Sequence, residues 1–224
     1  MVKLLILDAG PLISLTLNGL LYVLENIKKR FPTIEIIMTP QVKREAVDRP
    51  LKIKKYELEA IRVQDLLDKK VIKMSTDFIQ NKILEKETAN FIRAANSIFT
   101  GMGETVRPIQ EGEASCLAFS KLCGKENVIV IDERTTRILT EAPENLHKLM
   151  ERKNHMPLKF NRTNLKQFKD FKFIRSSEVL FIAYKNDLLN LKKDKQLLDA
   201  VLYGVKFRGT AVSSREIEEL KALA

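Results

Sequence analysis

The chain has 224 residues, of which 45% are hydrophobic, so it can bury a substantial core in one large domain or in a domain with an extension. No apolar run approaches the roughly 18 residues that span a bilayer, and we expect no membrane contact. The formal net charge of +10 favours a polyanionic partner.

The chain begins with an alternation of strand and helix patterns. The apolar residues within 2–8 predict a buried strand, and Gly10-Pro11 ends it and opens a helix. This run is too short for a signal peptide and lacks a basic leader, so we expect a cytoplasmic protein. Residues 20–30 have helical spacing and residues 34–38 predict a second strand. Thr39-Pro40 then has the N-cap and N1 residues of a further helix.

The middle of the chain has a mostly helical pattern. Two helices are expected within residues 51–100, separated by a short strand at residues 71–74. Residues 101–103 predict a flexible break between elements. Residues 112–122 predict a helix of small side chains, and residues 128–131 predict another buried strand.

The last third begins with two predicted helices, one over residues 135–139 and one opening at Pro143. Residues 152–170 are polar and basic, which predicts a loop or a mobile arm. The remaining expected elements are a strand at 171–174, a helix capped by Ser176 or Ser177, a helix at 197–202, and a last helix whose capping box is Ser213 with Glu216.

Alternating strands and helices predict an α/β fold with a mainly parallel sheet of about four to five strands and helices on both sides. We expect a core at residues 1–150, a basic loop or arm at 151–175, and a helical part at 176–224 packed on the core. Residues 152–175 carry eight Lys or Arg and one acid, interleaved with phenylalanines. This composition suits a strand of phosphates and bases, unless the phenylalanines enter the core.

Four separated carboxylates carry the functional hypothesis: Asp8, Glu45, Glu113 and Asp132. Two of them follow apolar strands, and the carboxyl ends of parallel strands meet at one edge where ligands bind. Clustered carboxylates repel one another unless a hard cation such as Mg²⁺ or Mn²⁺ holds them. Each also has an ordinary interpretation, because Asp8 and Asp132 suit N-caps, Glu113 suits a helix N-terminus, and Glu45 suits a solvated helix face.

The ordered set resembles the motifs of PIN-domain nucleases. The third segment has the Gly-Glu-Ala form common in archaeal and bacterial members. The resemblance extends over about residues 2–140 in the correct order. The four segments are residues 7–15 with Asp8, residues 39–47 with Glu45, residues 112–118 with Glu113, and residues 128–134 with Asp132 and Glu133.

The resemblance implies a three-layer α/β/α sandwich that binds one or two Mg²⁺ or Mn²⁺ ions and hydrolyses RNA with metal-activated water. Many members carry the fourth acid one residue later, and many carry Ser or Thr where this chain has Gly10. The residues implied are the catalytic acids Asp8, Glu45, Glu113 and Asp132 and the metal ligands Asp8, Glu113, Asp132 and Glu133, with Ser14 and Arg134 as candidate substrate contacts beside them. Outside the resemblance, the charge of the basic segment makes Lys166, Lys169 and Lys172 the further candidates for substrate binding.

Two roles are compatible with such a nuclease, namely RNA processing and a toxin with a partner antitoxin. The length and the basic segment favour processing, and the resemblance suggests a homodimer. The alternative is a catalytically weak or inactive PIN-like protein that binds RNA or acts as a scaffold. A Rossmann-type enzyme is disfavoured because no GxGxxG or GxxxxGK[ST] pattern occurs, so we expect no nucleotide cofactor.

Overall fold

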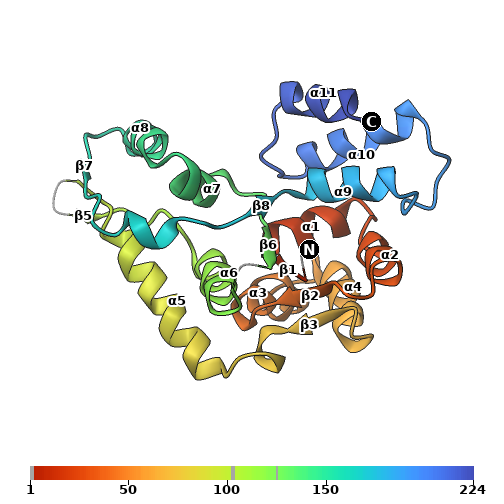
Figure 1. Cartoon of the computed structure of the whole chain (residues 1–224), viewed down its shortest axis with the longest axis horizontal. Helices are drawn as coiled ribbons and strands as arrows, with labels where there is room; N and C mark the ends of the chain where they lie inside the picture. Colours follow the sequence, from red (N-terminus) through yellow and green to blue (C-terminus); the bar gives the residue numbers. More distant parts are fainter. Residues whose placement is uncertain (1–2, 102–103, 125) are drawn as a thin grey trace.

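The computed structural model describes residues 3–101, 104–124 and 126–224 (Figure 1). These residues form a five-stranded sheet in which every neighbouring pair is parallel, as the sequence predicts. The expected break at residues 101–103 lies mostly outside the described residues. In spatial order the strands are β3 (Ile72–Met74), β2 (Glu35–Met38), β1 (Leu4–Leu7), β6 (Asn127–Val130) and β8 (Phe173–Ile174).

Strand β1 lies at the centre of the sheet and sets its register. Leu7 stands opposite Met38 of β2 on one side and Val130 of β6 on the other. The last three residues of each of these strands are buried and apolar, as expected where helices cover both faces of a parallel sheet. The residues that follow these strands therefore emerge together at one edge.

Helices cover both faces, which confirms the three-layer α/β/α arrangement (Figure 1). Right-handed crossovers place the helices that join β1, β2 and β3 on one face, and the return from β3 to β6 crosses the other. Among the described residues, no helix is long and apolar enough to cross a membrane. The first face carries α1 (Ala9–Leu17), α2 (Tyr22–Arg30), α4 (Glu57–Asp68) and α9 (Ser176–Lys185), and the second carries α5 (Asn81–Asn96) and α6 (Glu111–Leu122).

Short helical turns border the carboxyl edge of the sheet. Thr39 caps α3 (Pro40–Lys43) by accepting a hydrogen bond from the Val42 amide, as predicted. The helix then widens into a π-helical turn, η1 (Arg44–Asp48), which carries Glu45. Such widened turns occur often at functional sites. The turn η2 (Pro50–Lys52) follows it, and α7 (Arg134–Glu141) and α8 (Pro143–Asn154) extend from the end of β6.

Residues 152–170, predicted to be a loop or mobile arm, contain the end of α8 and two further short elements. Phe168 is fully buried and meets Phe91 of α5 edge to face, with 5.4 Å between ring centroids. Phe168 therefore packs in the core against α5, whereas Phe160 stacks on Phe99 with 5.2 Å between ring centroids. The short elements are η4 (Leu165–Phe168) and β7 (Lys159–Phe160), and β7 pairs with β4 (Phe99–Gly101) in a small antiparallel sheet that also contains β5 (Glu104–Thr105).

Two predicted helix starts are wrong. Residues 75–77, expected to cap α5, form a separate 3-10 turn, η3 (Ser75–Asp77), and α5 begins only at Asn81. Neither Ser176 nor Ser177 caps α9, because Arg175 occupies that position and the Ser176 hydroxyl bonds elsewhere. The capping box of Ser213 and Glu216 is confirmed at α11 (Ser214–Ala222), which packs on α10 (Lys195–Phe207).

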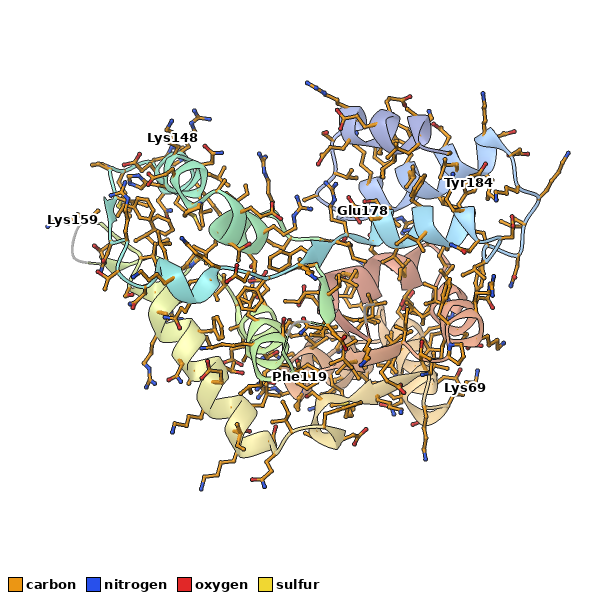
Figure 2. The ribbon with its side chains drawn as sticks, viewed as in Figure 1. Lys69, Phe119, Lys148, Lys159, Glu178 and Tyr184 are labelled. Atoms are coloured by element: carbon orange, nitrogen blue, oxygen red, sulfur yellow. The ribbon has the colours of Figure 1, made fainter. Side chains whose placement is uncertain are left out.

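Figure 2 shows how side chains fill the space between these layers, with Phe119 of α6 in the interior and Lys148 of α8 at the surface. Phe119 is fully buried and contacts Phe78 edge to face at 6.3 Å. The second face of the sheet is therefore closed by aromatic contacts between elements distant in the chain.

We predict that Phe91→Ala lowers the free energy of unfolding by about 3–5 kcal/mol, because it leaves a cavity where Phe91 meets Phe168 and Phe171. Urea denaturation monitored by circular dichroism measures this. The exposed Ile83 of the same helix is the control, and Ile83→Ala should cost about 0.5 kcal/mol or less. Equal losses in both variants would contradict this role for Phe91.

Candidate functional site

Asp8 lies at the carboxyl edge of the sheet, directly after β1, and is only 5% exposed. Its Oδ2 accepts a long hydrogen bond of 3.5 Å from the Gly10 amide, so it caps α1. Burial raises the pKa of Asp8 to about 7. The charges of Glu45 and Asp132 add to the rise, and backbone hydrogen bonds from Ala9 and Gly10 oppose it. The N-cap interpretation and the edge placement are therefore both observed.

Asp132 lies beside Asp8 but has a different environment. Both acids border Gly10. A Cβ added to Gly10 would lie 3.6 Å from Asp132 Cβ and 3.7 Å from Asp8 Oδ2, so the side chains of the two acids lie on either side of this position. Asp132 Oδ1 accepts from the Ser176 amide at 2.8 Å, and Oδ2 accepts from the hydroxyls of Ser176 and Thr210 at 2.9 Å. Both oxygens are thus engaged by the C-terminal part of the chain. Burial still raises the pKa of Asp132, against these hydrogen bonds.

Glu113 is 7% exposed in the first turn of α6, where its Oε2 accepts from the Gln110 amide at 2.8 Å. Burial raises the pKa of Glu113 to about 8. The charges of Asp8 and Glu133 add to the rise, and the hydrogen bond from the Gln110 amide opposes it. The expected role of Glu113 at a helix N-terminus is present, but the carboxylate also faces other acids.

Glu45 approaches this group from the π-helical turn. Its carboxylate lies against Gly112, where an added Cβ would be 2.8 Å from Glu45 Oε2, so the absence of a side chain at Gly112 makes room for it. Burial raises the pKa of Glu45, and the Gly112 amide and Arg49 oppose the rise. A hollow of about 640 Å³, lined by Arg49 and Arg107 among others, opens beside Glu45.

Cys116 shows that these acids surround one place. It is fully buried on α6, and its thiol points to the Leu7 carbonyl at 3.7 Å. Burial raises the pKa of this thiol, and the charges of Asp8, Glu113 and Glu45 raise it further. Three of the four predicted acids therefore act on the same side chain, with Asp132 adjoining Asp8.

The carboxyl groups are close but do not form a ready-made metal centre. Among residues 3–101, 104–124 and 126–224, no three His, Cys, Asp or Glu side chains are grouped so that they could hold a metal ion. Within the same residues, none of the four acids forms an ion pair with Lys, Arg or His. Their donors are hard oxygens, and Asp8 and Glu113 lie in the field of other acids, so the four residues fit a hard cation in kind although not in the present spacing.

The other predicted site residues are divided among several places. Glu133 is exposed and caps α7 through the Thr136 amide and the Thr135 hydroxyl. The Ser14 hydroxyl is buried and lies 3.3 Å from that of Thr210, so it joins the Asp132 network. Arg134 is exposed at the start of α7. Lys166, Lys169 and Lys172 are exposed on η4 and the segment leading to β8, and their role in RNA binding stays a prediction.

Sequence reasoning missed the partners of Asp132. Ser176 was expected to cap α9, and Thr210 carried no signal because its hydroxyl reaches Asp132 across 78 positions of the chain. The hydroxyls of Ser176 and Thr210 also lie 2.7 Å apart. Only the folded chain brings these groups together.

Comparison of the chain with known protein families, curated proteins and solved structures finds no match.

We predict that Asp8→Asn stabilises the metal-free protein at alkaline pH. The folded-state pKa of Asp8 is raised, so the folded protein binds the proton more tightly than the unfolded chain, and stability is lost as pH rises from about 4 through 7. In EDTA, the variant should exceed the parent by about 4 kcal/mol at pH 8.5, with the difference shrinking towards zero near pH 4. Denaturant melts across this range measure the effect, and the exposed Asp77→Asn is the control. A difference independent of pH would contradict the burial of an uncompensated Asp8 charge.

We predict that Thr210→Val lowers the free energy of unfolding by about 2 kcal/mol, because it removes a buried hydroxyl bonded to the Asp132 carboxylate without changing side-chain shape. Thermal or urea unfolding measures the loss. Thr163→Val, on an exposed position, should stay within about 0.5 kcal/mol of the parent. If the two variants match, Thr210 does not hold Asp132.

Proposed function

We propose that this protein is a Mg²⁺- or Mn²⁺-dependent ribonuclease whose site is the acidic edge of the sheet. The observation that carries the proposal is that the charges of Asp8, Glu45 and Glu113, from three separate elements, all act on the buried Cys116 thiol, with Asp132 acting on Asp8. The resemblance of the same four segments to PIN-domain motifs supports it. The net charge of +10 suits a polyanionic substrate.

The electrostatics of the edge supports cation binding. Asp8 and Glu113 have raised pKa values, so each carboxyl group loses its proton only at an energetic cost in the metal-free protein. A divalent cation removes that cost by neutralising the charges together. Asp8 and Glu113 would hold it, and Glu45 and Asp132 or Glu133 would complete the set. Cation binding requires these carboxylates to move closer than they stand here.

The chemistry follows from the charge of a phosphodiester. When bound, a divalent cation offsets the negative charge of the phosphate, lowers the pKa of a water molecule and stabilises the leaving oxygen. The chain's own residues orient this chemistry. The parallel strands fix the backbone at Asp8, and the hydroxyls of Ser176 and Thr210 fix Asp132 beside it. A fixed backbone of this kind limits the rearrangement that cation binding requires to short movements around the site.

One observation favours a second candidate, an inactive RNA-binding or scaffold protein of the same fold. Asp132 has both carboxylate oxygens occupied by hydrogen bonds, so its contribution here is to anchor the C-terminal helices. A protein that uses Asp132 only in this way would keep the acids and bind RNA without cutting it. Metal binding separates the two candidates.

We predict that the purified protein cleaves single-stranded RNA in Mn²⁺, and that Asp8→Asn and Glu113→Gln each reduce cleavage to the level without metal. Both changes remove a charge needed for the cation while keeping side-chain size. Gel analysis of a labelled RNA measures cleavage, and calorimetric titration with Mn²⁺ measures binding. Parent-like cleavage by both variants would sink the nuclease proposal.

The matched controls are Asp77→Asn and Glu141→Gln, which remove exposed carboxylates away from the acidic edge. Both should cleave RNA at the parental rate and bind Mn²⁺ equally well. Absence of Mn²⁺ binding in the parent, together with intact RNA binding, would favour the scaffold candidate.

A further inference from the structure

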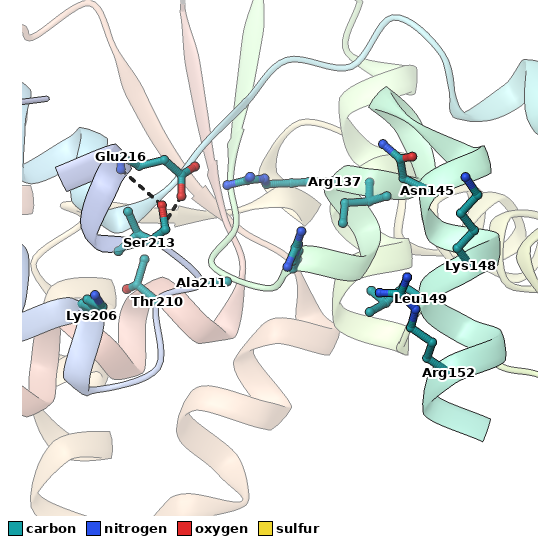
Figure 3. Close-up of a pocket in the computed structure, with 13 residues that line it drawn as sticks. Arg137, Asn145, Lys148, Leu149, Arg152, Lys206, Thr210, Ala211, Ser213 and Glu216 are labelled. Carbon is teal, nitrogen blue, oxygen red and sulfur yellow. Dashed lines mark hydrogen bonds between the residues drawn. The ribbon is translucent and has the colours of Figure 1, made fainter. Parts of the chain in front are cut away.

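A cleft of about 910 Å³ separates α7 and α8 from the C-terminal helices. Figure 3 shows Arg137, Lys148 and Arg152 along the α7–α8 wall, and Lys206 and Glu216 on the opposite wall. Arg134 also lines it, so five basic side chains border one cleft. None of these positions except Arg134 was predicted to contact a substrate.

The positive charge of this cleft is not neutralised internally. Within the described residues, none of the five basic side chains forms an ion pair with Asp or Glu. The one acid in the lining, Glu216, accepts from Arg175 Nη1 at 2.6 Å and from the Ser213 amide at 2.8 Å, so it is already engaged. Five cations with one engaged acid produce a positive potential that attracts anions.

Like charges lie close together along both helices of this wall. Lys148 and Arg152 are four residues apart on α8, and Arg134 and Arg137 are three apart on α7, so like charges lie on the same helix faces. Such pairs destabilise a helix slightly. A ligand that carries several negative charges would offset this repulsion.

The lining favours phosphates over bases. The thirteen lining residues include Asn145 and Ser213 as hydrogen-bonding groups and Ile138, Leu149 and Val212 as apolar ones, but no aromatic side chain. Binding of bases by stacking needs aromatic platforms, whereas cations and hydroxyls bind the backbone whatever its sequence. The cleft therefore suits a sugar–phosphate backbone bound without base preference.

The cleft leads to the acidic edge. Thr210, which lines it, donates to Asp132 Oδ2 at 2.9 Å, and the amide of Ala211, another lining residue, donates to the Asp132 carbonyl at 3.1 Å. Arg134 is two residues beyond Asp132. Because Asp8, Glu113 and Asp132 are each under 10% exposed, a flexible strand can approach them more closely than a rigid duplex can.

We infer that the cleft between α7–α8 and α10–α11 binds the backbone of single-stranded RNA and guides it to the acidic edge. That the cleft guides RNA to the acidic edge rests on the proposed function, whereas RNA binding by the cleft does not. The C-terminal helices thus supply one wall of the substrate path, and α8 supplies the other.

The test is RNA binding without catalysis. Fluorescence anisotropy of a short labelled oligouridylate, in EDTA, gives the affinity of the parent and of Lys148→Ala/Arg152→Ala as salt rises from 50 to 200 mM. Each lost phosphate contact lowers the slope of log affinity against log salt by about 0.7 for single strands, so the double variant should lose about 1.4. The parent's advantage should accordingly shrink about sevenfold over this range.

The matched control is Lys82→Ala/Lys86→Ala, which removes two exposed cations with the same four-residue spacing on α5. It should retain the parental slope, and both double variants should retain the parental unfolding midpoint. An unchanged slope in the cleft variant overturns the inference, as does equal loss in the control. The inference is also overturned if polyglutamate displaces the labelled oligouridylate as effectively as unlabelled oligouridylate does, or if the protein binds duplex RNA more tightly than single strands. Binding lost in the cleft variant while the parent fails to cleave RNA in Mn²⁺ supports the inference and rejects only the proposed nuclease.

Discussion

The parallel pairing of β1 with both β2 and β6 is the constraint on which the acidic edge depends. Leu7 stands level with Met38 and Val130, and the Asp8 amide donates to the Val130 carbonyl at 3.0 Å. This ladder fixes where Asp8 leaves the sheet and keeps the start of α3 and the residues after β6 beside it. A shift of one residue in either pairing would exchange the two faces on which the strand's side chains pack and would separate the acids.

The fold handles its buried carboxylates in two ways. Asp132 receives three hydrogen bonds from Ser176 and Thr210, which satisfy the carboxylate and tie the C-terminal helices to the sheet. Asp8 and Glu113 receive fewer, and each lies in the field of other acids. Asp132 therefore has a structural role at this edge, whereas ionisation of Asp8 and Glu113 is unfavourable in the metal-free protein. A bound cation would reduce the free-energy cost of ionising these two.

The parts of the fold that local signals determine were predictable from the sequence. The strands at the sheet centre follow from short apolar runs, and the caps at Thr39 and Ser213 follow from side chains that bond to amides three residues on. The π-helical turn at Glu45 and the anchoring of Asp132 were not, because they depend on contacts with Gly112, Ser176 and Thr210 far along the chain.

The phenylalanines of residues 160–173 are ambiguous in sequence alone, since burial against Phe91 is a property of the packed structure. The basic cleft was missed for a similar reason, as its walls meet only after the last helices fold back.

The position of β8 at the border of the sheet has a consequence for the order of assembly on the ribosome. Its partner β6 ends at Val130, whereas β8 begins at Phe173, so another 42 residues must be translated before the hydrogen-bonding groups on that side of β6 can be paired. Until then the nascent chain exposes an open strand border, which is a recognised route to wrong association between polypeptides. Pairing of β8 with β6 therefore covers this exposed strand edge during synthesis and completes the sheet of the folded protein.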